Sequence, residues 1–356
     1  MSALAAAAWP DENHSATRLL HVDPAESSFH DGLVTDLTKL LRPHDLLVLN
    51  DAATLPGSLL GWSPRGPLEI RLAGPPSGSD PSLWPAVLFG AGSWRERTEE
   101  RRPPPRLVAG DRIQLEPPGA RAGLAAEVIS VSPLSPRLVE LRFDREGAAF
   151  WAALFRLGRP VQYSYLSQPL PLWHVQTAFA GRPLAAEMPS AGRLLRLPLL
   201  RALHASGVAV AAVTHAAGLS STGDPALDAA LPLPELSLVP PAAVAAVERA
   251  RDASGRVVAV GTTVVRALEG AWRDGALRTV AATTDLRIGP GFRPRVVSGL
   301  LTGLHEPGES HFELLQAFAP RALLEAAVAH AAASGYRGHE FGDASLVLAS
   351  GSPGVR

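Results

Sequence analysis

The chain has 356 residues, no cysteine and a formal net charge of −1. At roughly 100 to 200 residues per domain, its length predicts two domains, or one large domain that carries an insertion. The absence of cysteine excludes disulfides, thiol nucleophiles, zinc–thiolate sites and iron–sulfur clusters. The balanced charge indicates no chain-wide basic field for nucleic acid, so any RNA contact has to be a local patch.

The N-terminal residues predict neither export nor membrane insertion. Met1 to Trp9 has no basic start and runs into Asp11-Glu12, which does not fit a secretory signal. No uninterrupted run of roughly 18 apolar residues occurs in the chain. We therefore expect a cytoplasmic protein.

An apolar strand is predicted at Asp45 to Leu49, and Asn50-Asp51 follows it directly. An amide and a carboxylate at a strand end can fix the hydroxyl or amino groups of a ligand. Asn-Asp after a strand is also a common turn signal. The sequence leaves both interpretations open.

The next third of the chain is rich in proline, with 17 of the 33 prolines between Pro56 and Pro171. Long helices are not expected there. Short β-rich segments bounded by Gly, Pro or Ser predict a small all-β barrel or sandwich. These segments are Leu68 to Leu72, Trp84 to Phe89, Asp111 to Leu115, Ala125 to Val131 and Arg137 to Phe143.

A polar loop follows at Ala185 to Arg193, and it contains Glu187, Met188, Ser190 and Gly192. Small residues on both sides of a carboxylate let a ligand approach the backbone closely. The loop can equally be a plain connection in which Met188 fills a gap.

The apolar run Gly207 to Val213 leads into Thr214-His215 and a flexible segment rich in Gly and Ser. A histidine at a strand end can act as a general acid or base near neutral pH. A lone histidine can also be purely structural, and the sequence alone does not decide between the two.

The run Arg256 to Val260 leads into Gly261-Thr262-Thr263, which open a helix expected to reach about Trp272. The free N–H groups and positive dipole end of such a helix suit a phosphate or a carboxylate. Arg266 lies one turn further on and could pair with the same anion. Ordinary N-capping by Thr262 would also explain the threonines.

Two polar clusters lie near the C-terminus. His305 to His311 holds two histidines and two glutamates, but its spacing does not match HExxH, so zinc is not expected. Tyr336 to Asp343 adds His339, Glu340 and Asp343 ahead of the apolar Leu346 to Leu348. Each cluster is either a solvated loop or part of a site.

Apolar strands that alternate with alanine-rich helical stretches favour an α/β fold with a largely parallel sheet covered by helices. Helices are expected at Leu199 to Ala205, Pro241 to Ala253 and Pro320 to Ala333. Because such segments flank the proline-rich region, we predict a discontinuous α/β core, residues 1–55 and 169–356, with an inserted small all-β barrel domain, residues 56–168. Ligands of open α/β sheets bind beyond the carboxyl ends of the strands.

Taken in order, these segments resemble the S-adenosylmethionine (SAM):tRNA ribosyltransferase-isomerases of queuosine synthesis along almost the whole chain. Gly261 to Glu269, which matches GTT-x-V-R-x-L-E, carries the most specific similarity. The resemblance implies an α/β core with an inserted β-barrel. It also implies a monomeric cytoplasmic transferase that moves the ribosyl part of SAM onto a 7-aminomethyl-7-deazaguanine in a tRNA anticodon. Isomerisation to epoxyqueuosine releases adenine and methionine. SAM is then a co-substrate, and no metal or other cofactor is expected.

Such chemistry needs a base beside the sulfonium, contacts to the leaving adenine and a clamp on the methionine carboxylate. From strand-end placement and the resemblance, we assign the base to His215 or His305, and ribose or amine contacts to Asp51, Glu187 and Asp343. The carboxylate or phosphate clamp is assigned to Thr262, Thr263 and Arg266. The remaining substrate-binding candidates are Asn50, Ser190, Gly192, Gly261 and Glu306.

The chain also departs from the family pattern. Ala53 and Ser58 stand where the family has the two arginines of T-R-V-I-P-A-R, and Leu194 stands where it has the histidine of P-T-A-G-L-H-F-T. The lost groups suit phosphate or base contacts. Two alternatives therefore accompany the tRNA-modifying enzyme: a SAM-cleaving ribosyl transferase with a non-tRNA acceptor, and a non-catalytic relative that binds SAM or RNA.

Overall fold

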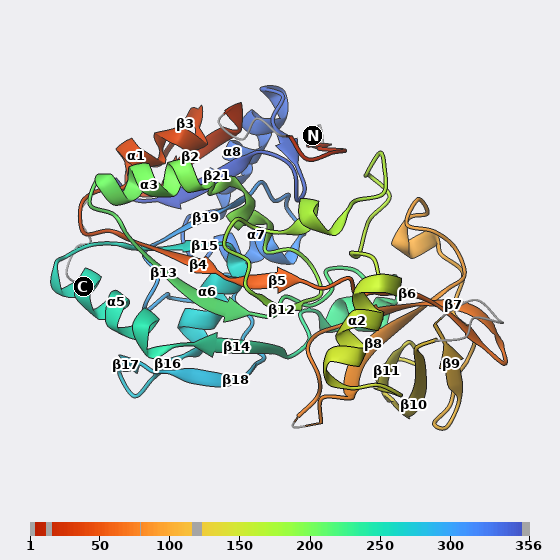
Figure 1. Cartoon of the computed structure of the whole chain (residues 1–356). Coiled ribbons are helices and arrows are strands. Elements are labelled where there is room, and N and C mark those ends of the chain that lie inside the picture. The colour runs from red at the N-terminus through yellow and green to blue at the C-terminus, as the bar shows by residue number, and fades with distance from the viewer. Residues whose placement is uncertain (1–3, 12–15, 79, 116–122, 351–356) are drawn as a thin grey trace.

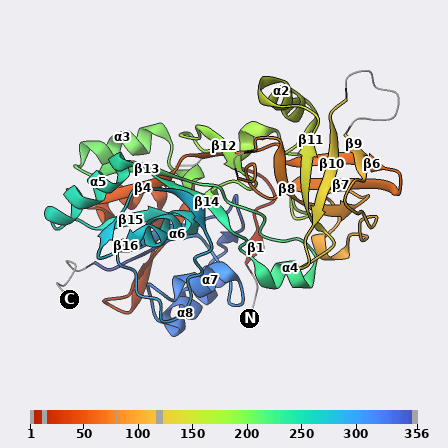
Figure 2. The same cartoon turned by 90° about the horizontal axis from the view of Figure 1, so that it is seen from below.

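The computed structural model describes residues 4–11, 16–78, 80–115 and 123–350. Their main features are a nine-stranded sheet with helices packed on it and a closed six-stranded barrel (Figure 1). The barrel and the sheet lie side by side (Figure 2). Within the described residues, no helix is long and apolar enough to cross a membrane.

The nine-stranded sheet is parallel at its centre and mixed towards its edges. The neighbouring pairs β13–β4, β4–β15 and β15–β19 are parallel, as is β2–β21, whereas the other four pairs are antiparallel. In spatial order the strands are β18 (Val280–Thr284), β14 (Glu235–Val239), β13 (Ala209–His215), β4 (Leu46–Asn50), β15 (Val257–Val260), β19 (Gly299–Gly303), β21 (Ala344–Leu348), β2 (Arg18–Asp23) and β3 (Ser28–Leu33). The predicted α/β core is confirmed.

Alternating side chains of the central strands build two apolar clusters, one on each face of the sheet. On β4, Leu46 and Val48 join one cluster, while Leu47 and Leu49 join the other. This alternation follows from the two-residue repeat of a strand, and a sheet buried on both faces needs apolar residues at every position. The first cluster includes residues of α5 (Pro241–Asp252), α6 (Thr262–Gly270), α7 (Ser310–Leu315) and α8 (Arg321–Ala333), and the second includes residues of α1 (Leu37–Leu40) and α3 (Leu197–Ala205).

The proline-rich region forms the predicted barrel. In spatial order its strands are β10 (Ala125–Val131), β11 (Leu138–Phe143), β8 (Leu83–Gly90), β7 (Gly66–Leu72), β6 (Ser58–Ser63) and β9 (Arg112–Gln114). Every neighbouring pair is antiparallel. Five of the strands match the predicted segments to within two residues at either end, and β6 was not anticipated. The boundaries of the insertion at residues 56 and 168 stay a prediction.

The expectation that this region holds no long helix is wrong. Helix α2 (Gly147–Leu157) spans 11 residues, because the prolines leave the stretch between Pro136 and Pro160 free. Its Phe150 ring lies 5.1 Å from that of Trp84, so the helix packs on the apolar interior of the barrel. The density of prolines over the whole region concealed this local gap.

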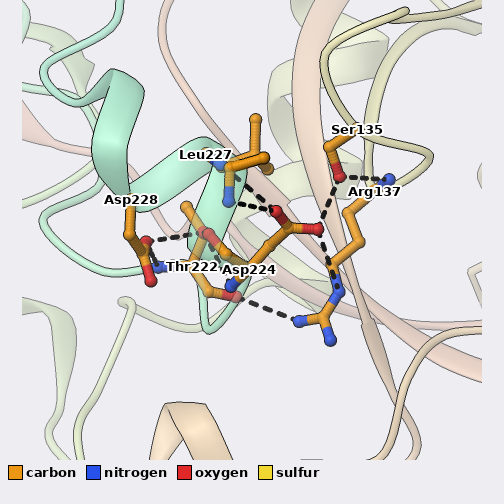
Figure 3. A network of polar contacts seen from close by, with 7 residues as sticks. Ser135, Arg137, Thr222, Asp224, Leu227 and Asp228 are labelled. Carbon is orange, nitrogen blue, oxygen red and sulfur yellow. Dashed lines mark hydrogen bonds and ion pairs between the residues drawn. The ribbon is translucent and has the colours of Figure 1, made fainter.

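A polar network joins the barrel to the chain that follows β13 (Figure 3). Ser135 Oγ donates to Asp224 Oδ2 at 2.7 Å, and Arg137 Nη1 donates to the Thr222 carbonyl at 3.1 Å. The other oxygen of Asp224 caps α4 (Pro225–Ala230). The segment that leaves His215 is therefore anchored on the barrel.

Three short strand pairs complete the fold: β1 (Ala5–Ala6) with β20 (Arg337–Gly338), β5 (Ala52–Thr54) with β12 (Arg182–Ala185), and β16 (Trp272–Arg273) with β17 (Ala276–Leu277).

Candidate functional site

The strand topology brings most of the predicted site residues to one edge of the sheet. Strands β13, β4, β15 and β19 run parallel, so their carboxyl ends, at His215, Asn50, Val260 and Gly303, share this edge. Strand β21 runs antiparallel to β19 and begins there, next to Asp343. This is the position where open α/β sheets bind ligands.

Asn50 ties three of these elements together. Its Oδ1 accepts from the amide of His215 at 3.0 Å, and its Nδ2 donates to the His215 carbonyl at 2.9 Å and to Thr263 Oγ1 at 3.1 Å. The Ala52 amide also donates to Oδ1. Because these contacts occupy its buried amide, Asn50 positions its neighbours in this structure.

His215 belongs to a buried charged network. It ends β13 with no exposed surface, and its Nε2 lies 2.7 Å from Glu235 Oε2 on β14. The guanidinium of Arg266 pairs with the same carboxylate, and the Gly218 amide donates to Glu235 Oε1 at 2.6 Å. Arg266 was expected to clamp a ligand anion, but here it holds Glu235 and the Leu286 carbonyl.

Burial opposes ionisation of Glu235, yet its pKa is lowered, because His215, Arg266 and the Gly218 amide together outweigh the burial. Glu235 is not among the predicted site residues, because its only signal in the sequence is an acidic residue at the start of a short strand. Among the described residues, neither His215 Nδ1 nor Arg266 Nη2 has a hydrogen-bond partner, although both atoms are buried.

A second histidine cluster adjoins the first. His305 Nε2 lies 3.0 Å from Thr302 Oγ1, and His305 Nδ1 lies 3.4 Å from Glu309 Oε2. The His305 and His311 rings stack with centroids 4.8 Å apart. Burial and the nearby His305 lower the pKa of His311 to about 4, and the charge of Glu235 also acts on it. The two predicted bases thus lie in neighbouring clusters.

The start of α6 differs in detail from the prediction. Gly261, at φ +90°, is the N-cap, and Thr262 is the first helical residue, so N-capping by Thr262 is not observed. A Cβ on Gly261 would lie 3.5 Å from the Cβ of Ala191, which shows how closely the Ser190–Leu194 turn approaches this helix. The helix start carries no side-chain cap, an arrangement suited to an anion.

Gly192, in the same turn, is needed for packing. A Cβ there would lie 2.8 Å from Phe179 Cζ. Ser190 begins this turn and is half-buried. The C-terminal part of the predicted polar loop, Ala185 to Arg193, therefore packs closely against its neighbours at the sheet edge.

Glu187 belongs to a third cluster, made of two carboxylates and two stacked tyrosines. Glu187 accepts from the Tyr163 hydroxyl and from the Ser220 amide, and Glu340 accepts from the Tyr165 hydroxyl. The tyrosine rings lie 6.4 Å apart at an interplanar angle of 14°. Burial raises the pKa of Glu187, and burial together with the charge of Glu187 raises the pKa of Glu340 to about 7. Both tyrosines were missed because they lie outside any strand end.

Three other acidic residues of the predicted site accept hydrogen bonds from backbone amides or a hydroxyl group of the protein. Asp343 accepts from the amides of Arg18 and Arg337, at 3.0 and 2.9 Å. Glu306 accepts from the Leu4 amide at 2.9 Å. Asp51 accepts from the Thr214 hydroxyl, and its Oδ2 lies 3.9 Å from Nε of the half-exposed Arg182.

The residues that replace family arginines and a histidine fit their surroundings. Ala53 lies on β5, and Ser58 Oγ donates to Glu69 Oε1 at 2.8 Å inside the barrel. Leu194 is buried in an apolar cluster. None of the three positions offers a charge.

The described residues contain no group of three or more His, Cys, Asp or Glu side chains placed to hold a metal ion. The polar groups at the sheet edge are histidines, carboxylates, arginines that contact carboxylates, and the start of a helix. Such groups suit acid–base chemistry and the binding of a charged organic ligand.

An α/β sheet with a polar carboxyl edge, together with an attached six-stranded barrel, makes this a two-part α/β protein. The model of the queuosine biosynthesis protein family matches residues 2–347, and the chain therefore belongs to this family. The resemblance inferred from its motifs is confirmed.

Relatives of known name support this placement. The S-adenosylmethionine:tRNA ribosyltransferase-isomerase of Acidiphilium cryptum (strain JF-5) is 35% identical over 350 residues, which cover 96% of this chain and 95% of the relative. The protein of that name from Anaeromyxobacter dehalogenans (strain 2CP-C) is 36% identical over 95% of this chain and 94% of its own length. A crystal structure of S-adenosylmethionine tRNA ribosyltransferase from Thermotoga maritima shares the fold, with a TM-score of 0.52, 23% identity and 96% coverage of both chains.

Proposed function

We propose that this protein is a SAM:tRNA ribosyltransferase-isomerase. It transfers the ribosyl moiety of SAM to a 7-aminomethyl-7-deazaguanine in tRNA and releases adenine and methionine. The observation that carries the proposal is the family match over residues 2–347, with relatives of that name at 35–36% identity over 95–96% of the chain. The clustered histidines and carboxylates at the sheet edge are consistent with polar sulfonium chemistry.

The proposed roles follow the geometry of the edge. His215 or His305 removes a proton beside the sulfonium, since each lies in one of two adjoining clusters. The uncapped start of α6, with Gly261, Thr262 and Thr263, receives the methionine carboxylate. Arg266 supports this site through Glu235.

Glu187 is the proposed contact for the acceptor amine. It is half-buried, and burial raises its pKa above that of an exposed glutamate. Glu340 lies close enough for the two charges to interact. Asp51 and Asp343 supply further polar groups for the ribose.

The partners proposed are SAM and the anticodon region of tRNA, with the protein acting as a cytoplasmic monomer. SAM is the co-substrate, and no further cofactor takes part in the proposed reaction. The α/β core of residues 1–55 and 169–356 carries the edge described above. The inserted barrel of residues 56–168 anchors the segment that leaves His215.

Adenine release tests the proposal. The protein is incubated with SAM alone, with SAM and a tRNA that carries the deazaguanine, and with SAM and the same tRNA carrying guanine. Adenine that appears only with the deazaguanine tRNA supports the proposal. Adenine released without tRNA indicates another acceptor, and no adenine in any mixture indicates a non-catalytic relative.

Two variants then test the base. We expect His215→Ala or His305→Ala to slow adenine release by about 10²- to 10⁴-fold, the usual contribution of a general base. Glu325→Gln, on the exposed side of α8, is the control and should retain full activity. Unchanged adenine release in both histidine variants would refute the base assignment.

A further inference from the structure

The contact with Glu235 bears on which of the two ring nitrogens of His215 carries a proton. An imidazole has two ring nitrogens, and only the unprotonated one can accept a proton. Which nitrogen is free depends on the hydrogen bond that the other one makes.

We propose that Glu235 is a positioning residue that holds His215 with its proton on Nε2, so that Nδ1 accepts the proton during catalysis. The assignment of Nδ1 to this proton transfer rests on the proposed function. The protonation pattern of the ring does not, because it follows from contacts within the protein.

The contact with Glu235 fixes the position of the proton. An ionised carboxylate is an acceptor only, so a nitrogen 2.7 Å from Glu235 Oε2 has to be the protonated one. That nitrogen is Nε2, and Nδ1 of a neutral ring then carries the lone pair. Among the described residues, Nδ1 has no hydrogen-bond partner.

Two further donors keep Glu235 ionised and fixed. The Arg266 guanidinium pairs with the oxygen that His215 contacts, and the Gly218 amide donates to the other oxygen at 2.6 Å. Arg266 is itself held by the Leu286 carbonyl at 2.9 Å. Because Glu235 and Arg266 balance each other's charge, a neutral imidazole fits the network, and Glu235 can stabilise the cation that forms on protonation.

His305 lacks this arrangement. Both of its ring nitrogens face protein groups, Thr302 Oγ1 at 3.0 Å and Glu309 Oε2 at 3.4 Å. The Glu309 side chain is 44% exposed, so its hold on the ring is weakened by solvent. The geometry therefore favours His215 over His305 as the base.

The C–H bond of the substrate carbon beside the sulfonium breaks, and its electron pair stays on that carbon. The proton joins the lone pair of His215 Nδ1, and the ring becomes an imidazolium whose Nε2–H still donates to Glu235. A buried acceptor without a partner is unfavourable, and a bound substrate whose C–H bond meets Nδ1 removes part of that cost.

Nitrogen-15 NMR of the histidine rings in the full-length wild-type protein tests the inference directly. The chain has 11 histidines, and the signals that disappear in His215→Gln identify the ring of interest. We expect Nε2 to be protonated and Nδ1 to be unprotonated at neutral pH. The reverse tautomer, or a doubly protonated ring, overturns the inference.

Glu235→Gln tests the positioning role. Both oxygens of Glu235 accept from the protein, so a glutamine has to turn its NH₂ either towards the Gly218 amide or towards Arg266 and His215 Nε2. In either orientation one group of donors loses its acceptor, so we expect the fraction of the Nε2–H form to fall. We expect kcat for adenine release to fall about 10²- to 10⁴-fold with little change in the KM for SAM. An unchanged tautomer with unchanged kcat overturns the role of Glu235.

Glu269→Gln is the matched control. Glu269 is also a buried carboxylate, but it accepts from the amides of Arg295, Val296 and Val297 at 2.8–2.9 Å and does not contact His215. Its replacement should lower thermal stability and leave the tautomer of His215 unchanged. If the wild-type protein releases no adenine, the proposed function fails, whereas the NMR result still decides the tautomer.

Discussion

Replacing Glu340 by Gln should stabilise the protein at alkaline pH. Glu340 accepts from the Tyr165 hydroxyl, and a glutamine oxygen can accept the same bond. Burial and the nearby Glu187 carboxylate raise the pKa of Glu340 to about 7 from an ordinary value of 4.5. The folded protein therefore keeps a proton on Glu340 over a range of pH in which the unfolded chain has lost it.

The sign and size of the effect follow from this difference in pKa. Between pH 4.5 and 7 the unfolded state binds fewer protons at this residue, so the free energy of unfolding falls as the pH rises. At about 1.4 kcal/mol per pH unit, the full difference gives an upper limit of about 3 kcal/mol. Glu340 is half-buried, and solvent screening reduces the expected value to about 1–2 kcal/mol.

Urea unfolding followed by the fluorescence of the seven tryptophans measures this effect at pH 5 and pH 8. Glu340→Gln should gain about 1–2 kcal/mol relative to wild type at pH 8 and much less at pH 5. Glu325→Gln, on the exposed face of α8, should differ from wild type by less than about 0.5 kcal/mol at both pH values. An equal effect of Glu340→Gln at both pH values would refute the reasoning from burial.

Three further outcomes are expected. Asp45→Asn, which breaks a buried ion pair with Arg256 at 2.6 Å, should cost about 3–5 kcal/mol in urea unfolding and leave kcat unchanged, because the pair lies at the opposite end of β4 from the site. Wild-type His311 has a pKa of about 4, so as the pH falls from 6.5 to 4 the unfolded chain binds a proton at this residue before the folded protein does, and the free energy of unfolding falls. His311→Asn should remove this contribution, which is at most about 3 kcal/mol. Tm measured against pH tests this. Gly192→Ala should lower the free energy of unfolding by about 1–3 kcal/mol, because Phe179 has to move; equal urea midpoints for the variant and wild type would contradict this.

Apolar runs in the sequence show where the strands end, and parallel strands place their carboxyl ends along one edge of the sheet. Asn50, His215 and Gly261 could be selected in this way, since each follows an apolar run, and the structure brings them together. The barrel strands were predictable for a different reason, because each is a short apolar segment between turn residues. Helix α2 was not predicted, because a local gap in the prolines mattered more than their density over the region.

Side-chain partners could not be predicted, because they depend on contacts between distant parts of the chain. Arg266 was assigned to an anion from its position on α6, yet Glu235, 31 residues earlier, is the group that it meets. Tyr163 and Tyr165 lie on neither a strand nor a helix, so no periodicity selects them. The strand order, with β14 next to β13, is what places Glu235 beside His215.

The sequence resemblance predicts arginines at positions 53 and 58, where the chain has the uncharged Ala53 and Ser58. Ser58 donates to Glu69, whose carboxylate also pairs with Arg71 and Arg101, and these two guanidinium groups are buried. Because both guanidinium groups are buried, with side-chain exposures of 2% and 0%, neither is open to a phosphate at the surface. Arg182, which pairs with Ala52 across β5 and β12, has a side chain that is 52% exposed. Under the proposed function, a tRNA backbone at this part of the sheet edge would meet Arg182, whose charge is partly offset by Asp51 at 3.9 Å, while positions 53 and 58 contribute no charge.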